Sequence, residues 1–223
     1  MPRTARIFQR ALCYHIMNRA IDRRTVFADD EDRAHFSGLV SDYKLTCGAA
    51  VYHWAWMESH YHMLIEVVFD NLRPFVGGLQ QAYAQYYPRR HGTCGVFWQG
   101  RFKSKPVEIG EYLARCGRYI ERNPVRAGIV TDAWEHPWSS ANAYVRGRAD
   151  GLTDLNGHLG APDGWTAADR EMYAAALRKS DDDAWMRRYR RTGTIGSVSF
   201  TGQLKKQHGR YRRRRGRPVK RQT

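Results

Sequence analysis

The stretch Glu58-Ser59-His60-Tyr61-His62-Met63 carries the strongest signal in the chain, because two histidines alternate with bulky, partly apolar residues. This period of two predicts a β-strand, in which successive side chains point to opposite faces. His60 and His62 should therefore project from one face, about 7 Å apart, while Tyr61 points to the other. Two imidazoles on one strand face are candidate metal ligands. The stretch thus predicts a strand that also carries part of a metal site.

A second motif, Tyr119-Ile120-Glu121-Arg122-Asn123-Pro124, follows at the end of a predicted helix over residues 108–122. Pro124 should end that helix, because the residue before a proline avoids the helical region. Tyr119 and Asn123 are four apart and share a helix face, so both can reach one site. Asn123 is also a common residue type at a helix C-terminus, and the two roles are compatible.

The hydrophobic pattern of the remaining chain mixes strands and helices. Two adjacent runs, 49–58 and 61–68, are close enough to form an antiparallel hairpin. Mixed strands and helices with a hairpin predict an α+β fold, an antiparallel sheet with helices packed on one face. Further strands are predicted over 14–18 and 96–106, the latter interrupted at Gly100, and further helices over 32–44, 72–87 (ended by Pro88) and 167–179.

The chain is strongly basic, with 37 Lys and Arg against 22 Asp and Glu, a net charge of +15. Such an excess favours a polyanionic partner, usually nucleic acid. A hydrophobic content of 42% is enough to build a core, which argues against a wholly disordered chain. We expect no signal peptide and no membrane partner, and therefore a cytoplasmic, nucleoid-associated bacterial protein. Four cysteines without a CxxC pair do not favour a disulfide framework or a structural zinc site.

The C-terminal segment 203–223 holds ten Lys or Arg and no acidic residue. Arg213, Arg215 and Arg217 lie in it, and Arg215-Gly216-Arg217-Pro218 resembles an AT-hook core. We predict a disordered tail that binds DNA and becomes ordered on it. The predicted division is a catalytic domain over 1–146, a linker with a short helical extension over 147–202, and this tail.

Four segments follow in order along the chain: Trp56-Met57-Glu58-Ser59-His60-Tyr61-His62-Met63-Leu64, Phe97-Trp98-Gln99-Gly100-Arg101-Phe102-Lys103-Ser104, Arg118 to Gly128, and Pro137-Trp138-Ser139-Ser140. Together they resemble the single-tyrosine HUH-type transposases, and among them the REP-associated tyrosine transposases. Any one segment is weak evidence, whereas all four at compatible spacings are strong. The chain departs from the family pattern at one position: Tyr61 stands between the two histidines, where the family usually has an aliphatic residue.

The resemblance implies a ferredoxin-like fold and a metal-dependent DNA transposase. Tyr119 is then the nucleophile, and His60, His62 and Asn123 hold Mg²⁺ or Mn²⁺. The expected reaction cleaves and rejoins single-stranded DNA at hairpin-forming, REP-like repeats through a 5′-phosphotyrosine. The family has both dimeric and monomeric members, so a homodimer and a monomer both stay open.

Basic residues alternate along the predicted strand 96–106, where Arg101, Lys103 and Lys105 share a face that suits a phosphate backbone. A solvated strand face is an equally good interpretation of these three residues. Trp98 and Phe102 have the shape to stack on bases, but core packing is the better default for them.

Two other functions stay open from the sequence. One is a catalytically inactive nucleic-acid-binding protein that keeps the fold. The other is a replication initiator or relaxase-type nickase of the HUH group, which often uses two tyrosines, here Tyr112 and Tyr119. A zinc hydrolase is the weakest alternative, because no third His or carboxylate stands at a recognised spacing.

Overall fold

The computed structural model describes residues 12–67, 71–155, 158, 164–179, 185–187, 189 and 192–208. Its centre is a four-stranded antiparallel sheet in the order β2-β3-β1-β4. The strands are β1 (Leu12–Arg19), β2 (Ala49–Met57), β3 (His60–Val67) and β4 (Lys103–Val107). The α+β class and the antiparallel sheet are thus confirmed, and the strand that carries both histidines lies inside the sheet.

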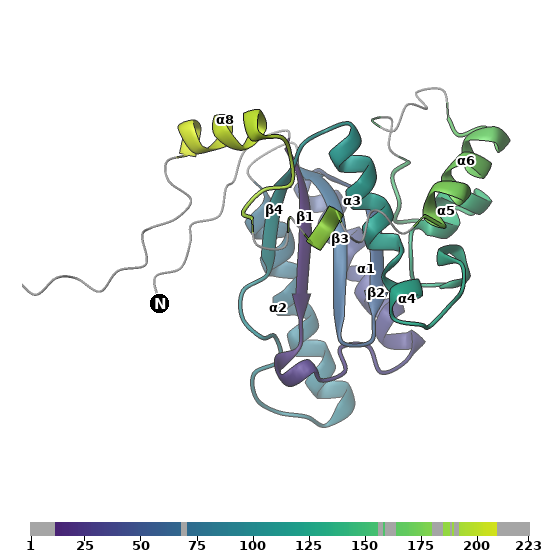
Figure 1. The fold of residues 1–223 in the computed structure, drawn as a ribbon. Coiled ribbons are helices and arrows are strands. Elements are labelled where there is room, and N and C mark those ends of the chain that lie inside the picture. Colours follow the sequence, from purple (N-terminus) through teal and green to yellow (C-terminus); the bar gives the residue numbers. More distant parts are fainter. Residues whose placement is uncertain are drawn as a thin grey trace, which may run out of the picture.

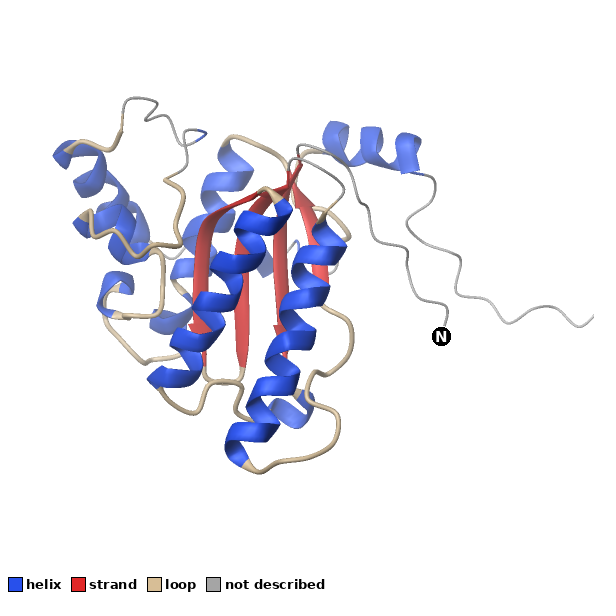
Figure 2. Cartoon of the chain, turned by 180° about the vertical axis from the view of Figure 1, so that it is seen from behind, coloured by secondary structure: helices blue, strands red, loops and turns tan. Residues whose placement is uncertain are grey.

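Two long helices, α1 (Asp30–Cys47) and α2 (Leu72–His91), cover one face of the sheet, as Figure 2 shows. The main core lies between them and the sheet. Alternate strand residues point into this core, because successive side chains of a strand point to opposite faces of the sheet. Tyr61, Met63 and Ile65 of β3 point into this core, where Phe36 and Phe75 of the two helices meet them.

The second face of the sheet is covered by α3 (Glu111–Glu121), which lies in front of β2 and β3 in Figure 1. Helices therefore lie on both faces, whereas the sequence predicted one. The physical reason is that alternate strand residues facing this side are also apolar, so they need a cover. Cys13 and Leu64 contribute to a second core with Leu113, Cys116 and Ile120 of α3.

Three predicted boundaries differ from the observed ones. Pro88 lies inside α2 instead of ending it. The extra turn is anchored because Arg90 and His91 bind the start of α1. Strand β4 begins only at Lys103, because Gly100, with φ 132°, breaks the path of the chain where an interruption was predicted. The helix α3 ends at Glu121, and Asn123–Arg126 forms a separate short helix, α4.

Both edges of the sheet are covered by the C-terminal part of the chain. Beyond β2 lie η2 (Ala133–Glu135), α5 (Ala141–Arg146) and α6 (Ala167–Leu177), with Ser140 N–H donating to Trp54 O at 3.1 Å. Beyond β4 lies α8 (Val198–His208), preceded by an Ile195–Val107 bridge. Figure 1 shows these segments at opposite edges, so parts of the segment 147–202 pack on the sheet domain.

The predicted tail falls largely outside the described residues. Residues 203–208 form the end of α8, and Arg213, Arg215 and Arg217 lie beyond them. The division into three domains stays a prediction. None of the helices in the described ranges is long and apolar enough to span a membrane.

Candidate active site

A cleft of about 640 Å³ opens on the face of the sheet that α3 covers. All of the predicted catalytic and metal-binding residues line it, together with the three basic residues of the predicted strand 96–106. These are His60, His62, Tyr119, Asn123, Arg101, Lys103 and Lys105. His60 and Asn123 lie 63 positions apart in the sequence, so the fold brings the two motifs together.

The two histidines lie on adjacent outward-facing positions of β3. Their ring centroids are 5.2 Å apart and their planes are perpendicular. Tyr61, between them, points into the opposite core, where its hydroxyl accepts a hydrogen bond from Gln80 Nε2 at 2.6 Å. The predicted face alternation is thus confirmed, and Tyr61 is separated from the cleft by the sheet itself.

Protein contacts fix the orientation of both imidazole rings. Nδ1 of His60 contacts Ser59 Oγ at 3.2 Å, and Nδ1 of His62 contacts His15 Nε2 at 2.9 Å. Histidine ligands usually hold their second ring nitrogen in such a contact, so Nε2 is the atom of each ring that could bind a metal. Burial, together with the charges of Arg19 and Arg126, lowers the pKa of His60 to about 4. His60 is therefore neutral at pH 7, the form that binds a metal.

Tyr119 and Asn123 approach the histidines from the end of α3. The Tyr119 ring stands edge-on to His62, with centroids 6.1 Å apart. Asn123 donates from Nδ2 to the carbonyls of Tyr119 and Ile120 at 3.0 and 2.9 Å, so it caps the helix as one of its two predicted roles requires. This bond directs the amide oxygen away from the helix, and Oδ1 lies 3.5 Å from Arg126 Nη1.

The side chains fit a divalent ion that takes some of its ligands from the protein and the others from water or substrate. The described residues contain no group of three or more His, Cys, Asp or Glu able to hold a metal. The candidate protein ligands are therefore two imidazoles and one amide oxygen. The remaining coordination positions of the ion would be filled by water and phosphate oxygens. Nδ1 of both rings is already engaged, as ligation through Nε2 requires.

Several residues of the cleft were not predicted as site residues from the sequence, and Arg126 and His15 are the two that contact the predicted ones most directly. The Arg126 guanidinium lies over the Tyr119 ring, 4.7 Å from its centroid. Its spacing of three from Asn123 was the available signal, since such residues are neighbours on one helical turn. His15 of β1 stacks on His62 with centroids 5.1 Å apart. No signal marks His15, because its neighbour is 47 positions away and is set by strand pairing.

The cleft wall is strongly basic. Arg19 and Arg126 join the predicted Arg101, Lys103 and Lys105, and the described residues that line the cleft include no aspartate or glutamate. Lys103 and Lys105 lie on the same face of β4, opposite Met17 and His15 of β1. A concave wall of one charge sign concentrates its field and attracts polyanions.

A buried polar network fixes the side of α3 that faces away from the cleft. Glu121 accepts hydrogen bonds from Ser140 Oγ at 2.6 Å and from Tyr173 Oη at 2.8 Å, and it pairs with His53 Nδ1 at 2.9 Å. All three partners come from different elements, so α3 is tied to β2, to the start of α5 and to α6. This network holds the helix that presents Tyr119.

Other aromatic candidates lie outside the cleft. Tyr112 packs against Trp185 and Tyr189, with centroids 5.7 and 6.0 Å apart, and does not line the cleft with Tyr119. Trp98 and Phe102 belong to the main core, as the default interpretation held.

Comparison with known proteins gives one family. The family model described as "Transposase IS200 like" matches residues 8–123, which is just over half of the chain. This range includes both histidines, Tyr119 and Asn123. No curated protein matches the sequence of the chain.

Two solved structures are similar in fold. The REP-associated tyrosine transposase bound to a REP hairpin has a TM-score of 0.57 at 16% identity, over 70% of this chain and 93% of its own. A proposed transposase from Deinococcus radiodurans R1 has a TM-score of 0.37 at 19% identity, over 54% of this chain and 97% of its own. The first of these supports the α+β architecture described above.

Proposed function

The chain belongs to the IS200-like transposase family, and from that premise we propose that it cleaves and rejoins single-stranded DNA at hairpin-forming repeats. The observation that carries the proposal is the convergence of His60, His62, Tyr119 and Asn123 in one basic cleft. The similar fold of a transposase bound to a REP hairpin supports a hairpin as the substrate. Action on bacterial DNA agrees with the cytoplasmic location that the sequence predicts.

Tyr119 is the proposed nucleophile. Its phenol oxygen attacks the scissile phosphorus, the new tyrosine O–P bond forms, and the bond from phosphorus to the 3′ oxygen breaks. The phenol proton ends on the released 3′-OH through solvent, so one phosphodiester is exchanged for a 5′-phosphotyrosine without any co-reactant. A 3′-OH that later attacks the phosphotyrosine reverses these steps and rejoins DNA.

His60, His62 and Asn123 would hold Mg²⁺ or Mn²⁺. When bound there, a divalent ion supplies Lewis-acid polarisation of the phosphate. The residues around it have separate tasks. Arg126, over the Tyr119 ring, offsets the negative charge that develops on the phenol and phosphate oxygens. Arg101, Lys103 and Lys105 bind the phosphate backbone and position the strand in the cleft.

A covalent-adduct assay tests the proposal directly. The full chain is mixed with 3′-labelled single-stranded hairpin oligonucleotides and Mn²⁺, and the products are separated on a denaturing gel. We expect a labelled protein band that is abolished in Tyr119→Phe and by a chelator. Tyr112→Phe is the matched control, because it removes a hydroxyl from the same helix outside the cleft, and it should retain the band.

The two alternative functions give different outcomes in this assay. Tight hairpin binding on a native gel without any adduct would favour the inactive nucleic-acid-binding protein. Loss of the second half-reaction in Tyr112→Phe would favour a two-tyrosine nickase of the replication-initiator or relaxase type. The position of Tyr112, packed against Trp185 and Tyr189 outside the cleft, speaks for a single nucleophile.

A further inference from the structure

His15 is a fully buried histidine beside one of the proposed metal ligands. It lies on β1, where Met17 is paired with His62 of β3, so His15 and His62 are diagonal neighbours on one face of the sheet. His15 Nε2 is 2.9 Å from His62 Nδ1, and the two rings stack at an interplanar angle of 26°. The side chain of His15 is 0% exposed.

The site of His15 is a poor place for a polar ring. Its neighbours on this face include Cys13 and Leu64, which belong to the apolar second core. Nδ1 of His15 is buried without a hydrogen-bond partner among the described residues. A buried polar atom left without a partner destabilises a fold, so an apolar residue would suit this position better. The His15 ring also stands edge-on to Tyr119, with centroids 6.2 Å apart, but its hydrogen bond is with His62, and leucine could not make that bond.

We infer that His15 is a positioning residue for the metal site, a role that rests on the proposed function. A neutral His62 can ligate through Nε2 only if its proton is on Nδ1. His15 Nε2 must then accept the 2.9 Å hydrogen bond that His62 Nδ1–H donates, and the proton of His15 itself lies on Nδ1. The opposite tautomer pair places a proton on His62 Nε2 and prevents ligation. His15 therefore holds His62 in the orientation and tautomer that bind a metal.

The test measures Mn²⁺ affinity of the full chain without DNA, by titration calorimetry and by the electron paramagnetic resonance of free Mn²⁺. His15→Leu should weaken Mn²⁺ binding by about 10- to 100-fold, the usual effect of removing such a partner, without lowering the melting temperature. His15→Gln, which restores an acceptor oxygen, should recover part of the affinity. His60→Ala, which removes a ligand, gives the reference for full loss.

His136 provides a matched control. It is also a buried histidine with one hydrogen bond, to Trp56 O at 3.1 Å, but it does not line the cleft. His136→Leu should lower the melting temperature and leave Mn²⁺ affinity unchanged.

Wild-type Mn²⁺ affinity in a folded His15→Leu variant would overturn the inference, and so would equal losses in His15→Leu and His15→Gln. If His15→Leu failed to fold, the His15→Gln variant would decide by the same comparison. Failure of the proposed function is separate, because it would appear as a wild-type chain that binds Mn²⁺ and hairpin DNA yet forms no adduct.

Discussion

At the scale of single residues, several side chains of the cleft act in both the fold and the site. Asn123 caps α3 through Nδ2, and the same hydrogen bonds direct Oδ1 away from the helix. Because capping sets the orientation of the amide, the structural and ligand roles support each other. Arg126 is exposed at the mouth of the cleft while its guanidinium covers the Tyr119 ring, so it can contact both protein and substrate.

The position of Arg126 leads to a prediction about rate. Arg126→Ala should lower the rate of adduct formation by about 10²-fold, as the loss of one group that stabilises developing charge does. Hairpin affinity should change little, since four other basic residues line the cleft. Single-turnover adduct formation at saturating DNA measures the rate, and a native gel measures the affinity.

Arg115→Ala is the control, because Arg115 lies on the same helix and pairs with Glu111 at 2.8 Å, outside the cleft. If the rate of Arg126→Ala were low only below saturating DNA and normal at saturation, Arg126 would contribute to DNA binding alone.

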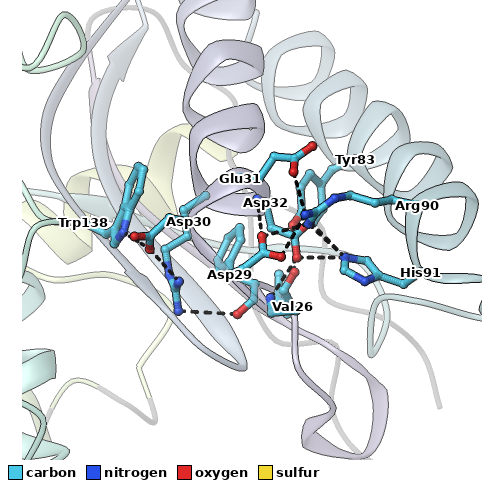
Figure 3. Close-up of polar contacts among 12 residues, drawn as sticks. Val26, Asp29, Asp30, Glu31, Asp32, Tyr83, Arg90, His91 and Trp138 are labelled. Atoms are coloured by element: carbon cyan, nitrogen blue, oxygen red, sulfur yellow. Dashed lines mark hydrogen bonds and ion pairs between the residues drawn. The ribbon is translucent and has the colours of Figure 1, made fainter.

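At the scale of elements, close packing of helices on the sheet places the reactive groups. Gly117 lets α3 approach β2, since a Cβ at this position would lie 2.5 Å from His53 Nε2. Tyr119 follows two residues later on the same helix. On the other face, α1 and α2 are joined by an acidic cluster at the start of α1 and two basic residues at the end of α2, shown in Figure 3.

The acidic cluster predicts how stability depends on pH. Arg90 donates to Asp29 at 2.8 Å and to Asp32 at 2.5 Å, and His91 Nε2 lies 3.0 Å from Asp32. The Arg90 contact is the main reason that the pKa of Asp29 falls to about 2. Burial raises the pKa of Asp32, but bonds from His91, the Ala28 amide and Arg90 outweigh it and hold that pKa below its usual value.

A carboxyl with a depressed pKa stabilises the fold above its unfolded-state pKa, and that contribution is lost as pH falls through the folded-state value. Arg90→Gln should therefore lower the melting temperature at pH 7, and the difference from wild type should shrink between about pH 4 and pH 2. Thermal unfolding followed by circular dichroism measures this. Exposed Arg73, on the same helix, is the control as Arg73→Gln. A difference that stayed constant down to pH 2 would contradict the assignment.

At the scale of the whole molecule, positive charge is divided between the cleft and the C-terminal segment. Residues 203–223 carry ten of the +15 net charges. The helix α8 includes residues 203–208 of this segment. Its Leu204 is buried, so α8 is part of the folded body. A truncation that tests the charged tail should therefore end at His208.

Removing residues 209–223 takes away eight Lys and Arg and no acidic residue. Hairpin affinity should then fall at low salt, and the plot of log affinity against log salt should become shallower, by about 0.7 for each single-strand phosphate that the tail had neutralised. Cleavage at saturating DNA should stay within about twofold, because the cleft is intact. Fluorescence anisotropy over a salt series measures the slope.

A second variant distinguishes the effect of the tail's charge from that of its length on the salt dependence. It keeps the full length and replaces four arginines by glutamine: Arg212, Arg213, Arg214 and Arg215. An unchanged slope in the truncated chain would show that the tail does not bind phosphates.

Much of the fold and of the candidate site was predictable, because both depend on local periodicity. The period of two around Tyr61 placed His60 and His62 on one face, and the spacing of four placed Tyr119 with Asn123. The number of covered faces was not predictable, because apolar residues on both sides of β1 and β3 say nothing about which helix packs where. The prediction that Pro88 ends α2 was wrong for a related reason, since the contacts that stabilise the turn after it are with residues of α1.

The sequence by itself determined the strand, the helix, the two motifs and the excess of positive charge, because each is encoded within a few neighbouring residues. Only the tertiary structure decided that the motifs share one cleft, that Arg126 covers Tyr119 and that His15 contacts His62. The last of these contacts joins residues 47 positions apart through strand pairing. Such pairings depend on the summed burial of the whole chain, so no local pattern records them.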